Sequence, residues 1–290
     1  MKKPVAPWSI EEISRQVHRL TFHECRAGRE FEVLLQTDEH WDNLHCDRKL
    51  LTRHHEEAIA KNAPIFKFGD VFCAMQGKWD KRADQSQLRP EHRGGNYLDL
   101  LVNTATNYYA PFAKNIALIT PGNHEGSILK RHETNLLERL HARLREKSTV
   151  PHLGSYTGFV QFRFDNGHGS QETILLHYHH GYGGGGEVTR GMIDNNRTRG
   201  QYLADIYVDG HIHRRNSDEN ILTCCNGHGR IVRRQQLFLR ASTYKDESTG
   251  DGYHVENGRA GRPLGGWWLK FRLKKIDGEM IVEVIEQRAV

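Results

Sequence analysis

Polar side chains that can bind metal ions stand at the ends of five apolar runs in this chain. The runs read FEVLLQT, IFKF, IALITP, ILLHYH and IYVD. Ligands collect beyond the carboxyl ends of the strands in open α/β sheets, so we expect the segments after these runs to form one shared site. The segments are Asp38-Glu39-His40, Gly69-Asp70, Gly122-Asn123-His124-Glu125, His180-Gly181 and Gly210-His211-Ile212-His213.

The ligand types in these segments are carboxylate, imidazole and amide oxygen, without a thiolate. This set suits harder or borderline divalent ions such as Mn, Fe or Zn. The ligands are too many for one tetrahedral ion, but they suit a pair of ions that share a bridging carboxylate. Two-metal sites, with ions roughly 3.5–4 Å apart, are built for in-line displacement at phosphorus. The order of the motifs therefore predicts phosphoester chemistry, although each motif alone is common.

The run HYHH offers more histidines than such a site needs. Strand alternation places His177 and His179 on one face of the strand and His180 on the other. This separates the candidates but does not choose between His179 and His180 as the ligand. His177 is interpreted as a structural residue.

The composition favours one class of protein and excludes two others. The chain has 290 residues, a formal net charge of +5 and 19 histidines, and its hydrophobic fraction is 37%. No stretch approaches the roughly 20 apolar residues of a membrane span. The N-terminus lacks the apolar core of a signal peptide. The five cysteines contain no CxxC spacing, which indicates a reducing compartment. A cytoplasmic protein without a membrane partner is predicted.

The elements that would position the site alternate between apolar strands and amphipathic helices. Helices are expected over residues 9–20, 47–61 and 97–110, and one more from the GNHE motif to about residue 147. No linker divides the chain, so a single domain over residues 1–290 is predicted. Four polar stretches are expected to be long loops, namely residues 76–96, 181–200, 214–234 and 245–263.

From about residue 31 to residue 213, these motifs resemble those of the calcineurin-like metallophosphoesterase family. The HHGYGGGG loop and the stretch DIYVDGHIHRR look most like the phage and prophage members. The resemblance implies an α/β fold, a four-layer α/β/β/α sandwich of two mixed sheets. Strands from about residue 220 to residue 290 would complete the second sheet. It also implies a cytoplasmic location in a phage-infected bacterial host.

The resemblance also implies a role for each motif residue. Asp38, His40 and His213 would hold one metal ion. Asn123, His180 and His211 would hold the other, because the family places its ligand directly before a glycine, which selects His180. Asp70 would bridge the ions and His124 would be the catalytic histidine. Two divalent cations are expected, with Mn as the predicted ion and Fe, Zn, Ni or Co as alternatives.

The substrate is predicted from the loops. The second motif reads GDVFCAMQG and lacks the arginine of the protein phosphatases in the family. This difference makes a protein phosphatase a less favoured interpretation. Basic side chains contact phosphates and aromatic rings stack on bases, so a phosphodiesterase or nuclease acting on DNA or RNA through a metal-bridging hydroxide is favoured. Arg214 and Arg215 are predicted to bind substrate. The alternatives are a phosphatase, a small-nucleotide phosphodiesterase and a non-catalytic nucleic-acid-binding protein. The wider set of loop residues is Lys78, Trp79, Lys81, Arg82, Arg89, Tyr182, Arg190, Arg197, Arg199, Tyr202, Arg230, Arg233 and Arg234.

Overall fold

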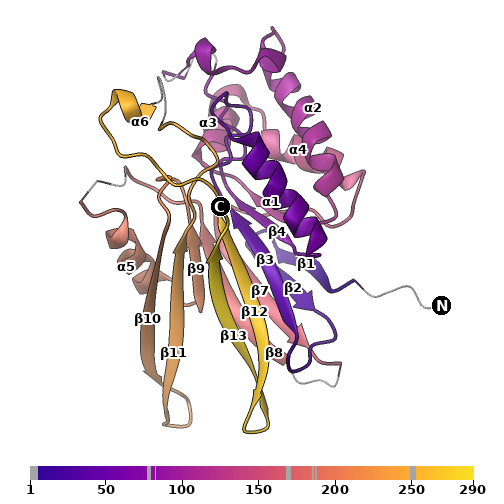
Figure 1. Ribbon diagram of the computed structural model, residues 1–290, viewed down its shortest axis with the longest axis vertical. Coiled ribbons are helices and arrows are strands. Elements are labelled where there is room, and N and C mark those ends of the chain that lie inside the picture. Colours follow the sequence, from indigo (N-terminus) through magenta and orange to yellow (C-terminus); the bar gives the residue numbers. More distant parts are fainter. Residues whose placement is uncertain are drawn as a thin grey trace, which may run out of the picture.

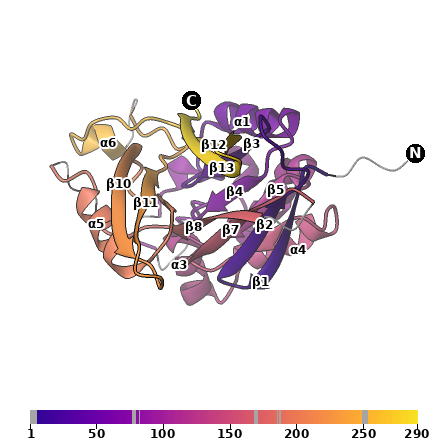
Figure 2. The same cartoon turned by 90° about the horizontal axis from the view of Figure 1, so that it is seen from below.

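Two mixed β-sheets form the centre of the computed structural model, which describes residues 6–76, 80–81, 83–167, 171–184, 186, 188–248 and 253–290 (Figures 1 and 2). The first, here called the β3 sheet, has the order β13-β12-β3-β4-β5-β6. Its strands are β3 (Glu30–Gln36), β4 (Ile65–Phe68), β5 (Ile116–Thr120), β6 (His152–Leu153), β12 (Trp267–Ile276) and β13 (Glu279–Arg288). Strands β3 to β6 run parallel, whereas β12 is antiparallel to both of its neighbours.

The second, here called the β8 sheet, has the order β1-β2-β7-β8-β9-β11-β10. Its strands are β1 (Trp8–Ser14), β2 (Val17–Phe22), β7 (Thr157–Asp165), β8 (Gln171–His179), β9 (Ile206–Asp209), β10 (Asn216–Cys225) and β11 (Ile231–Arg240). Within it β8, β9 and β11 run parallel. The C-terminal strands are thus divided between the two sheets, whereas the sequence predicted that they complete only the second.

The core lies in three layers that follow from the sheets. Phe66, Phe162 and Phe271 belong to the apolar cluster that joins the facing sides of the two sheets. A second cluster joins the outer face of the β3 sheet to helices α1 (Arg48–Ala60), α2 (Tyr97–Tyr109), α3 (Asn123–His132) and α4 (Leu136–Arg145). On the outer face of the β8 sheet, Tyr207 and Phe238 pack with Ala204 just after helix α5 (Met192–Gln201). The predicted α/β/β/α sandwich is confirmed.

Residues 9–20 form a β-hairpin and not the predicted helix. Strands β1 and β2 pair antiparallel, with Ile10 opposite Leu20. The burial alternates along β2, where His18, Leu20 and Phe22 are buried and the residues between them are not. Ile10, Val17 and Leu20 also fit a helical spacing, but β-branched residues favour strands once a neighbouring strand can pair with them.

Two other predicted elements differ in the structure. The long helix after GNHE is divided into α3 and α4, because Glu133 adopts a left-handed conformation (φ 53°) that ends α3. The polar stretch 214–234 contains most of the β10–β11 hairpin, and 181–200 contains most of α5. The remaining helices are short: η1 (Gln85–Gln87), η2 (Pro90–His92), η3 (Ala110–Phe112) and α6 (Tyr253–Glu256). None of the helices in the described ranges is long and apolar enough to span a membrane.

Candidate metal centre

All five predicted segments meet where the two sheets face each other. Segments after β3, β4 and β5 come from the β3 sheet, and those after β8 and β9 come from the β8 sheet. Because the strands are parallel within each set, their carboxyl ends lie at the same edge. Three sets of potential ligand atoms result among the described residues, and the atoms of each set lie within 4.8 Å of one another. Two sets consist of predicted metal ligands, namely Asp38, His40 and His213, and Asp70, His180 and His211, and the third consists of His40, Cys73 and His124.

The first group brings two imidazoles against one carboxylate. Nε2 of His40 lies 3.1 Å from Nε2 of His213, which is 3.4 Å from Oδ1 of Asp38. The His40 nitrogen is 4.0 Å from the same oxygen. Ligand atoms about 2.1 Å from one ion lie about 3.0–3.5 Å apart, so this spacing suits a divalent cation.

Asn123 completes the second group. Its Oδ1 is 3.1 Å from Nε2 of His180 and 2.9 Å from Nδ1 of His211. Nε2 of His180 also lies 3.1 Å from Oδ2 of Asp70. Because Nδ1 of His180 lies 3.0 Å from the carbonyl of Phe68 and donates to it, Nε2 is the nitrogen left to face these oxygens.

A buried oxygen without a hydrogen bond supports a cation between the groups. Oδ1 of Asp38 has no hydrogen-bond partner among the described residues. It lies 3.4 Å from Nε2 of His213 and 4.0 Å from Nε2 of His180, so it touches both groups. A buried carboxylate oxygen is costly unless it is paired or coordinates a metal. The residues therefore fit two adjacent divalent cations, with Asp38 or Asp70 available to both.

Five of the site residues have a strained backbone conformation. Asp38, His40, Asp70, His211 and His213 all have positive φ, between 46° and 67°. For residues other than glycine this conformation is uncommon and clusters at functional sites.

Two glycines make room for these carboxylates. A Cβ at Gly122 would lie 2.0 Å from Oδ1 of Asp70, and one at Gly210 would lie 2.4 Å from Oδ2 of Asp38. Both positions require glycine, because any side chain would displace a predicted ligand.

The charges of the groups leave the carboxylates ionised. Burial raises the pKa of Asp38, but the imidazoles of His180 and His213 outweigh it, and the pKa is lowered. The pKa of Asp70 is lowered further for the same reason, with His180 and His124 as the main partners. Burial and the neighbouring His124 hold the pKa of His40 well below its usual range. The neutral imidazole of His40 and the two carboxylates are in the protonation states that bind metal ions. Asp70 and Asp38 outweigh the effect of burial and raise the pKa of His180 to about 10, so His180 must release a proton when a metal ion binds.

His124 stands at the first turn of α3, beside the second group. Its Nδ1 donates to the carbonyl of Cys73, so Nε2 faces the site, 3.7 Å from Oδ2 of Asp70. Its backbone N–H donates to Oδ1 of Asp70 over 3.0 Å. Glu125 holds this turn, because its carboxylate accepts from the backbone of Phe72 and Gly122.

A buried polar network behind the site was not predicted. Glu39 lies between two predicted ligands, and its carboxylate contacts Nζ of Lys67 and the hydroxyl of Tyr109. Lys67 is also 3.1 Å from Oε1 of Gln36 and 3.0 Å from Nε2 of His55. From the sequence alone, a lysine and a loop glutamate are expected to be exposed to solvent. Their pairing becomes visible only when the fold brings them together.

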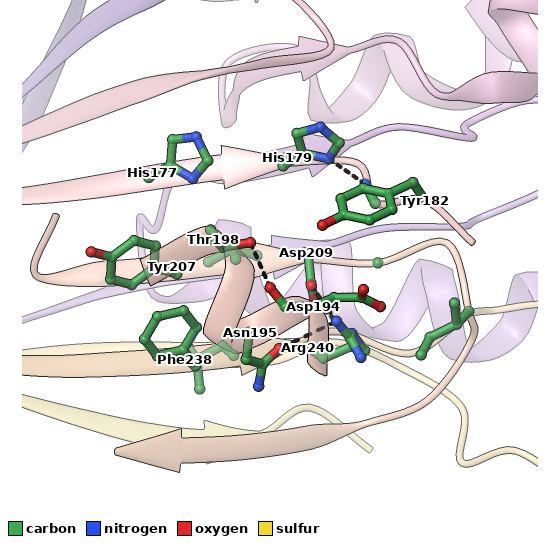
Figure 3. Close-up of a pocket in the computed structure, with 15 residues that line it drawn as sticks. His177, His179, Tyr182, Asp194, Asn195, Thr198, Tyr207, Asp209, Phe238 and Arg240 are labelled. Atoms are coloured by element: carbon green, nitrogen blue, oxygen red, sulfur yellow. Dashed lines mark hydrogen bonds and ion pairs between the residues drawn. The ribbon is translucent and has the colours of Figure 1, made fainter. Parts of the chain in front are cut away.

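The histidines before His180 lie outside the cluster. Nδ1 of His179 accepts from the backbone N–H of Gly181, and His177 stacks on Tyr202 with ring centroids 4.0 Å apart. Figure 3 shows both rings beside a pocket that α5 covers, with Asn195 and Arg240 on its other side. The pocket has a volume of about 20 Å³, which is room for roughly one water molecule.

Several predicted basic residues are engaged elsewhere. Nη2 of Arg215 donates to the carbonyls of Leu264 and Ala289, so this side chain is held by the backbone, and its assignment to substrate stays a prediction. Arg214 has a partner of its own and is half-buried. Arg89 donates to the loop carbonyls of Asn43 and Cys46, and other basic residues pair with carboxylates. These pairs are Arg199 with Asp218 and Arg234 with Asp205, whereas Lys78, Trp79 and Arg82 lie outside the described residues.

The basic end of the β10–β11 hairpin is remote from the metal-binding groups. Strand β11 runs parallel to β9, so its last residue, Arg240, pairs with Asp209 just before the site. Arg233 lies seven positions earlier in β11, and at about 3.3 Å per residue this is roughly 23 Å away. Figure 1 shows this hairpin extending away from the end of the sheet that carries β9's loop.

Sequence comparisons with known proteins do not assign this chain to a family. No protein-family model and no curated protein sequence matches the chain. The calcineurin-like phosphoesterase YfkN from Bacillus subtilis is 12% identical, with 90% of this chain and 91% of that chain covered and a TM-score of 0.37. The metallophosphoesterase from Sphaerobacter thermophilus is 12% identical, with 89% and 88% covered and a TM-score of 0.33. Vacuolar Protein Sorting 29 from Cryptosporidium parvum is 16% identical, with 89% and 98% covered and a TM-score of 0.33. Similarities this low carry no argument, so the site rests on its own geometry.

Proposed function

We propose that this chain is a metal-dependent phosphoesterase of the calcineurin-like family. The observation that carries the proposal is the meeting of two groups of buried or half-buried ligands around Oδ1 of Asp38, which has no hydrogen-bond partner among the described residues. When bound, two adjacent divalent cations would activate a water molecule and neutralise charge on a phosphoryl group. The first would be held by Asp38, His40 and His213, and the second by Asp70, Asn123, His180 and His211.

His124 is the proposed catalytic residue. The hydrogen bond from Nδ1 to the carbonyl of Cys73 fixes the ring, so Nε2 is the nitrogen that can move a proton. It can protonate the leaving oxygen, and as an imidazolium it would also stabilise negative charge on the phosphoryl group. The N-terminus of α3 starts at Asn123 and favours an anion at the same place.

The proposed substrate is a phosphodiester, and more specifically a phosphodiester bond of DNA or RNA. Arg190 supports a nucleic-acid substrate, because its side chain is exposed at the end of the β8 sheet that carries the metal-binding residues. Its carbonyl accepts from Arg240 and Asn216 at this end. The engaged Arg215 and the remote Arg233 do not support it.

The decisive experiment is a substrate panel on the purified protein with Mn²⁺, Fe²⁺, Zn²⁺, Ni²⁺ or Co²⁺ added. We expect hydrolysis of bis-p-nitrophenyl phosphate to exceed that of p-nitrophenyl phosphate, and single- or double-stranded DNA to be cut. Asp70→Asn should lower both the bound metal and the activity. A panel without turnover of any phosphoester would overturn the proposal, and a preference for the monoester would favour a phosphatase.

A further inference from the structure

Lys245 and Glu247 form a buried ion pair beside the metal-binding groups. Nζ of Lys245 lies 2.6 Å from Oε1 of Glu247, and the side chains are 5% and 8% exposed. The pair follows β11, so it comes from a sixth strand end that the sequence did not single out. Neither residue belongs to the predicted ligand set.

The backbone fixes this segment against the first ligand loop. The hydroxyl of Thr243 and the backbone N–H of Tyr244 both donate to the carbonyl of Asp38, over 2.7 and 3.0 Å. Lys245 itself forms a β-bridge with Cys46. The lysine is therefore held at a set position relative to the cluster.

The carboxylate of the pair lies close to one of the proposed metal ligands. Oε2 of Glu247 is 3.9 Å from Nδ1 of His213, whose Nε2 faces Asp38. The charge of Lys245 also adds to burial and to the neighbouring imidazoles in lowering the pKa of His40. Through the carboxylate of Glu247, the ammonium group is linked to the side of the His213 ring that carries Nδ1.

Lys245 differs from the other buried cations near the ligand loops. Lys67 contacts Glu39, Gln36 and His55, and Arg240 contacts both oxygens of Asp209. Those contacts enclose each cation in the fold. The contact between Lys245 and one oxygen of Glu247 uses one N–H of an ammonium group that has more than one donor.

We propose that Lys245 is a substrate-binding residue whose ammonium group donates to a non-bridging oxygen of the phosphate at the metal centre. Glu247 is its counter-ion in the free protein, because a buried ammonium group without a partner would be strongly destabilising. Lysine binds phosphate as a point charge, and this role suits a site that receives a phosphoryl group. The role rests on the proposed phosphoesterase function.

The test is the binding of inorganic phosphate to the Mn²⁺-loaded protein by calorimetry, which needs no turnover. Lys245→Met should weaken phosphate binding about ten- to hundredfold, the effect of one hydrogen bond to a charged group. Glu247→Gln should have the opposite sign and tighten phosphate binding, because it removes a competing carboxylate. Bound metal is measured for each variant so that a loss of Mn²⁺ is not mistaken for a loss of phosphate binding.

Lys274→Met is the matched control, because Lys274 pairs with Glu283 over 2.7 Å on β12, away from the site. It should leave phosphate binding unchanged. A pair that only stabilises the fold would lose thermal stability from either end, with equal phosphate affinity in all variants, and that result overturns the proposal. If Lys245→Met does not fold, unchanged or weaker phosphate binding by Glu247→Gln overturns it as well. Hydrolysis of bis-p-nitrophenyl phosphate by the wild-type protein separates this failure from a failure of the phosphoesterase function.

Discussion

Glu39 and Lys67 form an ion pair directly behind the loop that holds two of the metal-binding residues. Both side chains are 1% exposed. Asp38 and His40 lie on either side of Glu39 and face the cluster, with φ values of 51° and 46°. Because Glu39 is tied from behind to Lys67 and Tyr109, the pair holds this strained loop in place.

We predict that Lys67→Met lowers both stability and metal affinity, because it leaves the buried Glu39 carboxylate without its counter-ion. The free energy of unfolding should fall by about 3–5 kcal/mol. The double variant Glu39→Leu/Lys67→Met removes both charges and should recover much of this stability, while its affinity for Mn²⁺ stays reduced. Denaturation with urea and Mn²⁺ titration measure the two effects. Full recovery of metal affinity in the double variant would mean that the pair only stabilises the fold.

The strand ends of the site could be predicted because each has a local signal. An apolar run such as that before Asp70 ends in glycine and a polar residue, and parallel strands bring such ends together. The sequence also predicted the separation of His180 from His177 and His179, because alternation is a property of the strand itself.

The missed features depend on contacts between distant residues. The N-terminal hairpin was not predicted, because His18 is a polar residue in the sequence. In the structure His18 is fully buried, as Leu20 is. Lys67 and Lys245 look like surface residues until a carboxylate is found beside each of them. Arg215 was assigned to substrate, and Arg233 was included among the basic loop residues, from charge alone; the fold places Arg215 against backbone carbonyls and Arg233 far from the cluster.

His180 and His179 can be separated by metal content. His180→Ala removes the nitrogen that lies 3.1 Å from both Asp70 and Asn123, so we expect affinity for the second ion to fall at least about tenfold. His179→Ala is the matched control, because its ring contacts Gly181 and Tyr182 outside the cluster. Elemental analysis after dialysis measures both variants. An equal loss of metal from each would contradict the assignment of His180.

His124→Asn should separate catalysis from metal binding. The imidazole is the proposed proton donor and holds no metal ion, so we expect kcat for bis-p-nitrophenyl phosphate to fall about 10²–10⁴-fold. Metal content and KM should stay close to the wild-type values. A fall in kcat well below tenfold would remove His124 from the chemistry.

His18 should make stability depend on pH. Burial, with smaller effects from His152 and Arg15, lowers the pKa of His18 to about 4, from an unfolded value near 6.5. The unfolded chain therefore binds the proton first, and the stabilisation present above pH 6.5 is lost as the pH falls toward 4. The loss is at most about 3 kcal/mol.

The variant His18→Phe should show a smaller loss of unfolding free energy between pH 6.5 and 4.5 than the wild-type protein, by about 1–3 kcal/mol. Urea denaturation at several pH values measures it. His228→Phe, in the exposed turn between β10 and β11, is the control and should follow the wild-type curve. Parallel curves for all three proteins would show that His18 does not set the pH dependence.

The nucleic-acid proposal predicts a salt effect that depends on Arg190. Each phosphate that a basic side chain neutralises releases counterions, so DNA binding should weaken steeply as salt is added. Arg190→Glu should flatten the slope of log affinity against log salt by about 1. It should spare hydrolysis of bis-p-nitrophenyl phosphate, because Arg190 is not among the proposed metal-binding or catalytic residues. Lys147→Glu, on the exposed turn before β6 and so at the amino edge of the β3 sheet, is the matched control and should leave the slope unchanged. Equal slopes for the wild-type protein and both variants, together with rapid hydrolysis of the small diester, would restrict the substrate to small phosphodiesters and leave the metal-dependent chemistry intact.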